Sequence, residues 1–155
     1  MTRPPARSER SVLKVVFDTV VFVRCLINPH SLWGRVVFSH YQDYQLFVSP
    51  PVLREILEVL RRPELTRKFR AFARLDVDRV LELLATAQVV EIPIIPSASR
   101  DLKDDKFLAT GETGQVDYLV SEGQDLLVLK VFKGFKIIDT KSFLAILEAA
   151  QEANH

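Results

Sequence analysis

The chain has 155 residues, of which 48% are hydrophobic and 26% charged, and its formal net charge is +1. This length suits one domain, the apolar content is enough for a sizeable core, and the charged fraction argues against general disorder. The single cysteine, Cys25, excludes an internal disulfide framework and fits a reducing compartment. Because the net charge is near zero, a nucleic-acid partner would need a local basic patch.

The composition of the N-terminal residues predicts a simple domain organisation. Residues 1–11 are basic and contain Pro4 and Pro5, so we expect a disordered basic tail there and one folded domain over 12–150. No secretory apolar run follows the tail, and no run reaches the roughly 18 apolar residues that a membrane helix needs. We therefore expect a cytoplasmic protein with no membrane partner.

Strand-like and helix-like segments alternate along the first part of the chain. The β-branched run 12–17 is typical of a strand buried on both faces of a parallel sheet. A helix is expected over 31–42, and 45–48 predicts a short second strand. A cap followed by proline at 49–50 predicts the next helix, whose apolar stripe is Val52, Leu53, Ile56, Leu57 and Leu60.

The second part continues the alternation. Pro63 ends the previous helix, Asp76 can cap another, and 88–92 predicts a third strand. The remaining elements are a short helix around 107–108, strands over 117–120 and 136–138, and a helix from Thr140. This order predicts an α/β fold of three layers, with helices on both faces of a central parallel sheet of about five strands.

Acidic residues follow several of the expected strands. Asp18 directly ends the most apolar strand, and Glu55 lies in the helix after the second; the others are Asp101, Asp104, Asp105, Asp117, Glu122 and Asp125. Ligands of such sheets bind outside the carboxyl ends of the strands, so we expect most of these acids to gather there. Taken singly, an acid at a helix start is as readily a cap, and Glu55 alone is more typical of a solvated rim residue.

Four converging acids would repel one another, at a cost on the order of 4 kcal/mol for two unit charges about 4 Å apart. Such a cluster needs protons or cations, and oxygen-only ligands select Mg²⁺ or Mn²⁺. One or two such ions can activate water for phosphodiester hydrolysis. A thiol nucleophile at Cys25 with His30 or His40 has no supporting signature, and neither a zinc spacing nor a glycine-rich phosphate loop occurs.

A basic cluster lies in the middle of the chain, formed by Arg61, Arg62, Arg67, Lys68, Arg70 and Arg74. Phe69 and Phe72 interleave with it. Basic side chains can hold an RNA backbone, and exposed aromatic rings can stack on unpaired bases. The alternative is a solvated helix face whose phenylalanines belong to the core.

Several segments in fixed order resemble the PIN-domain nucleases, in particular the toxin components of toxin–antitoxin pairs. They are VVFDT (15–19), LINPHS (26–31), SPPVLREILEVL (49–60), DLKDDKFLA (101–109), VDYLVS (116–121), DLLVL (125–129) and KIIDTKSFL (136–144). The resemblance spans about 12–147. It implies a PIN-like fold, a ribonuclease site dependent on one or two Mg²⁺ or Mn²⁺ ions, an RNA substrate, an antitoxin partner and a homodimer.

The resemblance also implies roles for individual residues. It gives Asp18, Glu55, Asp104 and Asp117 as catalytic acids, and Asp18, Asp104, Asp117 and Glu122 as metal ligands. The implied supporting residues are Thr19, Asp101, Asp105 and Asp125.

Two departures from the family pattern fall at this implied site. Val20 stands where the family has asparagine, and Gly123 stands where it has aspartate, with Glu122 one place earlier. The longer Glu122 side chain can reach the same metal or point elsewhere. A degenerate PIN domain with weakened or lost catalysis, acting as an RNA-binding or protein-interaction module, is therefore the alternative. A phospho-receiver domain also has acids at strand ends, but Asp18 lacks the adjacent acid that it needs.

Overall fold

The computed structural model describes residues 12–62, 70–93 and 102–153, with the backbone alone for 70–73 and 102–103. The strands are β1 (Leu13–Phe17), β2 (Tyr44–Val48), β3 (Gln88–Val89), β4 (Tyr118–Val120), β5 (Val131–Phe132) and β6 (Phe135–Ile138). The helices are α2 (Thr19–Ile27), α3 (Leu32–Gly34), η1 (Arg35–Ser39), η2 (Tyr41–Asp43), α4 (Pro50–Leu60), α6 (Arg70–Ala85), α7 (Leu102–Gly114), α8 (Gln124–Leu127) and α9 (Thr140–Ala153). Residues 1–11 of the expected tail lie outside the described residues.

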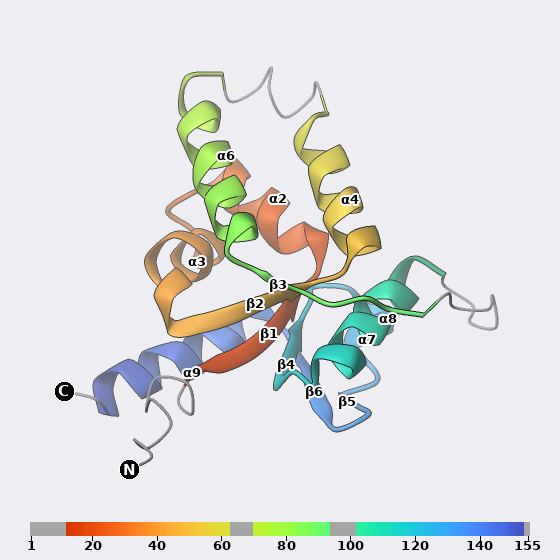
Figure 1. The fold of residues 1–155 in the computed structure, drawn as a ribbon. Helices are drawn as coiled ribbons and strands as arrows, with labels where there is room; N and C mark the ends of the chain where they lie inside the picture. Colours follow the sequence, from red (N-terminus) through yellow and green to blue (C-terminus); the bar gives the residue numbers. More distant parts are fainter. Residues whose placement is uncertain (1–11, 63–69, 94–101, 154–155) are drawn as a thin grey trace, which may run out of the picture.

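One sheet runs through the molecule, with strand order β3-β2-β1-β4-β6-β5 (Figure 1). Every pairing is parallel except that of β5 with β6, which confirms the predicted α/β class. The sixth strand is an addition to the expected five. β5 is too short for a periodicity signal, and it joins β6 through Lys133 and Gly134, whose φ angles of 46° and 92° are those that a tight two-residue hairpin requires.

Three helical segments differ from the sequence expectation. No helix was expected over Thr19–Ile27, because its valines resemble a continuing strand, yet the Asp18 side chain caps α2 there. The helix expected over 31–42 is divided into α3, η1 and η2. Asp76 does not begin a helix but lies buried inside α6.

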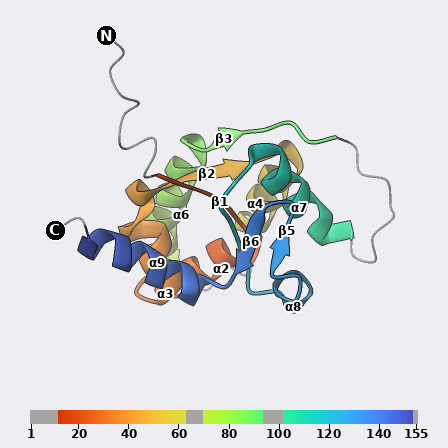
Figure 2. The ribbon, with the colours of Figure 1, turned by 90° about the horizontal axis from the view of Figure 1, so that it is seen from below.

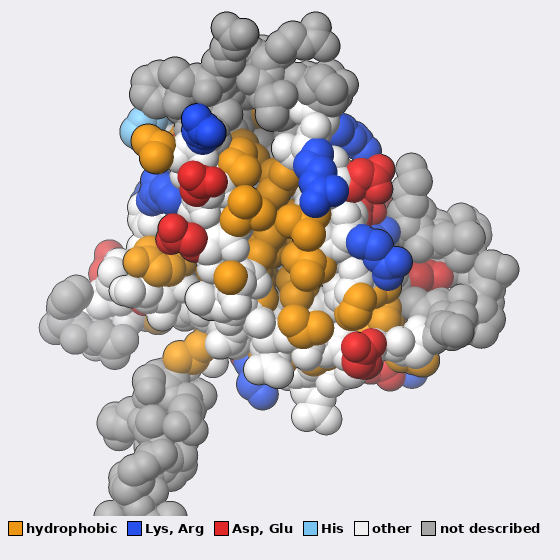
Figure 3. Space-filling view, turned by 45° about the horizontal axis from the view of Figure 1, so that its top comes forward, with side chains coloured by type: hydrophobic (Ala, Val, Ile, Leu, Met, Phe, Trp, Pro, Cys, Tyr) orange, Lys and Arg blue, Asp and Glu red, His pale blue; other side chains and the backbone are white. Residues whose placement is uncertain are grey.

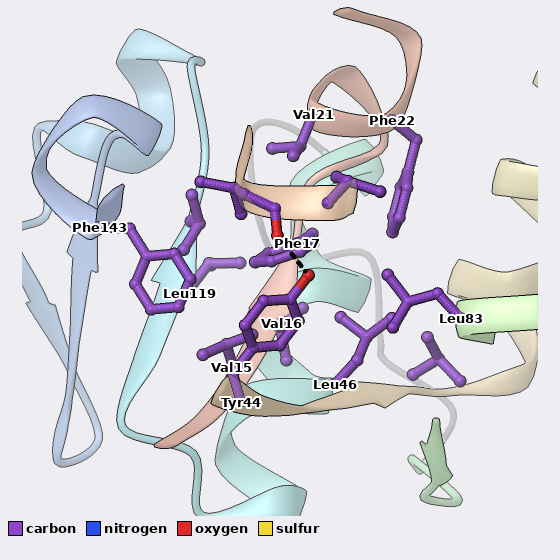
Figure 4. Packing of buried hydrophobic residues seen from close by; sticks show 14 of the residues in the cluster. Val15, Val16, Phe17, Val21, Phe22, Tyr44, Leu46, Leu83, Leu119 and Phe143 are labelled. Atoms are coloured by element: carbon purple, nitrogen blue, oxygen red, sulfur yellow. Dashed lines mark hydrogen bonds between the residues drawn. The ribbon is translucent and has the colours of Figure 1, made fainter. Parts of the chain in front are cut away.

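The two faces of the sheet are covered by different helices (Figure 2). Helix α7 packs on one face, against β1, β2 and β4, while α2 and α9 lie on the other. On the α9 face, Phe143 contacts the rings of Phe17 and Tyr44, as Figure 4 shows among the buried side chains. On the opposite face α7 approaches closely through Gly111, where a Cβ atom would lie 2.7 Å from the ring of Phe135. These contacts hold α9 and α7 against opposite faces of the sheet.

None of the helices in the described ranges is both long enough and apolar enough to cross a membrane.

Candidate active site

Asp18 lies directly after β1, at the carboxyl end of the sheet. One carboxylate oxygen accepts a hydrogen bond from the Val20 backbone N–H at 3.3 Å, and the other accepts one from the Ser121 hydroxyl at 2.7 Å. The residue is only 9% exposed. Burial raises the pKa of the Asp18 carboxyl above its usual value, although the hydrogen bonds from Ser121 and Val20 oppose this. A nearby cation would therefore stabilise the ionised Asp18.

Glu55 and Lys106 form an ion pair beside Asp18. Lys106 Nζ lies 2.8 Å from Glu55 Oε1, and the Thr19 hydroxyl donates to Glu55 Oε2. Since Thr19 follows Asp18 directly and Glu55 belongs to α4, this contact joins the first strand end to α4. The predicted convergence of Asp18, Thr19 and Glu55 is thus present in the structure.

Asp104 and Asp105 are half-buried in the first turn of α7. Asp104 precedes the buried Phe107 and Gly111 by three and seven residues, so it lies near the helix face that packs on the sheet. Asp105 falls on the other side of the helix. Asp101 lies outside the described residues.

Asp117 lies at the opposite end of the sheet from Asp18. Its carboxylate accepts a hydrogen bond from the Lys14 backbone N–H at 2.9 Å, and the next residue, Tyr118, is paired with Val15. Asp18 is three strand residues beyond Val15, a distance of about 10 Å. The structure therefore does not bring Asp117 to the other acids, contrary to the expectation of one shared edge: an acid that opens a parallel strand is at the wrong end.

Glu122 has a set of partners away from Asp18. Its Oε2 atom accepts hydrogen bonds from the Thr140 backbone N–H at 3.0 Å and from the Trp33 indole at 3.2 Å, and Oε1 lies 3.8 Å from Arg24. The Arg24 guanidinium in turn lies over the Trp33 ring. Glu122 therefore ties the start of α9 to α2 and α3. Asp125 is exposed in α8.

The contacts of Glu122 predict a structural role. We expect Glu122→Ala to lower the free energy of unfolding by about 1–2 kcal/mol, because the α9 N–H and the indole lose their acceptor. Urea denaturation measures this change. Mn²⁺ affinity, measured by calorimetry, should stay within a factor of about two. A large loss of Mn²⁺ binding in a folded variant would instead make Glu122 a metal ligand.

Gly123 is open toward Asp18. A Cβ atom at Gly123 would lie 3.9 Å from Asp18 Oδ2 and 3.5 Å from Ser121 Oγ, both ordinary contact distances. The Gly123 backbone N–H donates to the same Ser121 hydroxyl that binds Asp18. The position that carries aspartate in the resembling family thus faces the site, but here it contributes only its backbone.

The acidic side chains that the structure describes could supply only some of the ligands of a metal ion. Among the side chains that the structure describes, no three acids, histidines or cysteines form a group that could hold a metal ion. Mg²⁺ commonly keeps several waters and binds one or two carboxylates together with substrate phosphate oxygens. Asp18, a buried carboxylate at the end of a strand, fits that mode as one of the carboxylates.

The predicted basic cluster lies partly outside the described side chains, namely at Arg67, Lys68 and Arg70. Arg61 and Arg62 are exposed at the end of α4, and Arg74 is exposed on α6. Arg61 is six residues beyond Glu55 on the same helix, about 9 Å along its axis. In Figure 3, an apolar strip lies between α4 and α6. Lys and Arg side chains predominate on its α4 side, and both acidic and basic side chains lie on its α6 side.

Two residues of the site, Ser121 and Lys106, are not among those predicted from the sequence. Ser121 ends the apolar run of β4 as a fully buried hydroxyl, and that polar position after a buried strand is the signal that could have found it. Lys106 follows two aspartates, so in the sequence it resembles an ordinary surface charge.

Comparison with known proteins supports one family. The model of the PIN domain matches residues 14–125. An uncharacterized protein of Methanocaldococcus jannaschii, MJ1680, is 28% identical over 129 residues, which cover 80% of this chain and 79% of that protein.

Two solved structures share the fold. PAE2754 from Pyrobaculum aerophilum has a TM-score of 0.57 at 16% identity, covering 90% of this chain and 94% of its own. VapBC2 from Rickettsia felis, bound to a DNA fragment from its promoter, has a TM-score of 0.53 at 8% identity, covering 82% and 98%. Because the family model spans well over half of the residues, the chain belongs to the PIN-domain family of nuclease-type domains.

Proposed function

We propose that this protein is an endoribonuclease that hydrolyses RNA phosphodiester bonds with the help of Mg²⁺ or Mn²⁺. The observation that carries the proposal is Asp18, a buried carboxylate at the carboxyl edge of the sheet with Glu55 and Lys106 beside it. Membership of the PIN-domain family supports a nuclease. The exposed Arg61 and Arg62 support a polyanionic substrate.

Each residue of the site has its own proposed role in this reaction. Asp18 and Asp104 would hold the divalent ion, which supplies positive charge to a phosphate and an activated water. Ser121 and the Val20 N–H hold the Asp18 carboxylate in one orientation. Glu55 orients Lys106 through their ion pair, and the basic residues at the end of α4 bind the RNA backbone.

The test is cleavage of an unstructured RNA by the pure protein. We expect cleavage in Mg²⁺ or Mn²⁺, none after EDTA treatment, and recovery when the ion is restored in excess. A DNA strand of the same sequence serves as the substrate control. Cleavage that persists in EDTA would contradict the metal requirement, and a failure to cleave any RNA in either ion would contradict the nuclease.

A degenerate binding module is the second candidate, favoured by Val20 and Gly123. At these two positions the chain lacks the amide and the carboxylate of the resembling family, so catalysis would be weak or lost. Under this alternative the protein binds RNA in EDTA as tightly as in Mn²⁺ and does not cut it. Gel-shift titrations in the two conditions distinguish the candidates.

An antitoxin protein is the proposed partner. The solved complex from Rickettsia felis supports this, because VapBC2 shares the fold. The apolar strip between α4 and α6 in Figure 3, which is bordered by charges, would suit a protein partner. Co-expression with a neighbouring small gene should yield one complex in size-exclusion chromatography and suppress RNA cleavage. A homodimer stays a prediction.

A further inference from the structure

We propose that Lys106 is a fixed cation of the active site, which takes the place of a second divalent ion and limits the site to one. The inference rests on the proposed function and deepens it, since it concerns how the same site balances its charge. Lys106 would then be a residue that acts on the phosphate together with a single metal ion.

The position of Lys106 is built into the fold. The Ser49 hydroxyl, just before α4, is 2.7 Å from the Thr110 hydroxyl of α7, and Thr110 donates to the Lys106 backbone carbonyl at 2.6 Å. Ser49 and Thr110 are fully buried, and Lys106 is half-buried. This chain of hydrogen bonds sets α7 against α4 and brings Lys106 to Glu55.

The charge of Lys106 is directed into the site. Its side chain is 17% exposed, less than that of Glu55 at 31%, so the ammonium does not extend into solvent as most lysines do. The ammonium is also close enough to Asp18 to favour its ionised form. Ion pairs that are exposed on a surface contribute little to stability. Surface stabilisation alone therefore does not account for the half-buried position of Lys106.

Glu55 is fully engaged while Lys106 is present. One of its oxygens is bound by Lys106 and the other by the Thr19 hydroxyl. Because one of these donors is a cation, the Lys106 ammonium would repel a second divalent ion that approached Glu55. Formally, Asp18, Glu55 and Asp104 carry three negative charges and Lys106 one positive charge, which leaves two for a single divalent ion to balance.

The experiment compares Mn²⁺ binding to wild-type protein, Lys106→Met, Lys106→Gln and Lys106→Arg by isothermal titration calorimetry. Lys141→Met, which removes an exposed lysine of α9, is the matched control. We expect about one ion per wild-type chain, and roughly tenfold tighter Mn²⁺ binding or a second bound ion when the ammonium is removed. Lys106→Arg and Lys141→Met should bind as the wild type does.

Turnover supplies the second readout. We expect kcat on RNA to fall about tenfold or more in Lys106→Met and Lys106→Gln despite the tighter metal binding, and to be partly retained in Lys106→Arg. A merely structural role would not raise metal affinity while lowering kcat. Unchanged or weaker Mn²⁺ binding in both folded neutral variants would overturn the inference. If the neutral variants bind Mn²⁺ more tightly but the wild type cuts no RNA, the nuclease proposal alone fails.

Discussion

Gly123→Asp is expected to tighten Mn²⁺ binding and to raise RNA cleavage, each about tenfold or more, by adding a carboxylate next to Asp18. The backbone at Gly123 has φ of −82° and ψ of 130°, which any residue adopts. The new Cβ atom would lie 3.9 Å from Asp18 Oδ2, in ordinary contact. The change therefore adds a ligand at little steric cost.

The same variant should respond to metal in its stability. Without a divalent ion, the added carboxylate lies close to the ionised Asp18, and the two charges repel. We expect the melting temperature of Gly123→Asp to be below that of the wild type in EDTA and above it in saturating Mn²⁺, because binding to the folded state alone stabilises that state. Differential scanning fluorimetry in both buffers measures the two shifts.

Gln124→Asp is the matched control for this prediction. It adds the same charge one residue later, at an exposed position that begins α8. Both Mn²⁺ affinity and turnover should stay within a factor of about two of the wild type. An equal gain in the two variants would show that net charge, and not a new ligand beside Asp18, causes the effect.

The contrast between Gly123 and Glu122 shows what the sequence can and cannot predict about this site. The resemblance to the family identifies Gly123 as the position that lacks an aspartate. The direction of the Glu122 side chain is not predictable in this way, because Trp33, Arg24 and Thr140 lie 89, 98 and 18 positions away in the chain. That conclusion needs the hydrogen bonds of Glu122 to the indole and to the α9 backbone.

Asp117 shows a second limit of prediction from the sequence. The expected strand over 117–120 already places Asp117 at the amino end of the strand, whereas its implied catalytic role would need the carboxyl end. With β4 beginning at Tyr118, Asp117 opens the strand and lies level with Lys14. Asp18 was placed correctly because the β-branched run that it ends has a sharp boundary.

The fold itself was predictable where apolar periodicity is strong. The buried strands β1, β2 and β4 and the apolar stripe of α4 follow the expected order. α2 was missed because its own hydrophobic residues occur on nearly every side of the helix, so its sequence has little helical periodicity. Only the capping contact of Asp18 with Val20 marks its start, and the same carboxylate is the centre of the proposed active site.

That double role underlies the prediction for Asp18→Asn. We expect RNA cleavage to fall about 100-fold or more, because the neutral amide no longer attracts a divalent ion. We also expect the metal-free protein to be up to about 1 kcal/mol more stable in urea denaturation. Asparagine caps a helix as well as aspartate does. Its oxygen can accept from the Val20 N–H while its NH2 group donates to the Ser121 hydroxyl oxygen, so the fold should be kept.

The sign of the stability change follows from the environment of Asp18. Burial raises the pKa of this carboxyl, so at neutral pH the folded protein holds a charge that the unfolded chain holds more easily. The amide removes that cost. Asp139→Asn is the control: Asp139 precedes α9 and its pKa is lowered by hydrogen bonds from Ser142, so the same replacement there should not stabilise and should leave cleavage unchanged. A destabilised but active Asp18→Asn variant would make Asp18 a helix cap and nothing more.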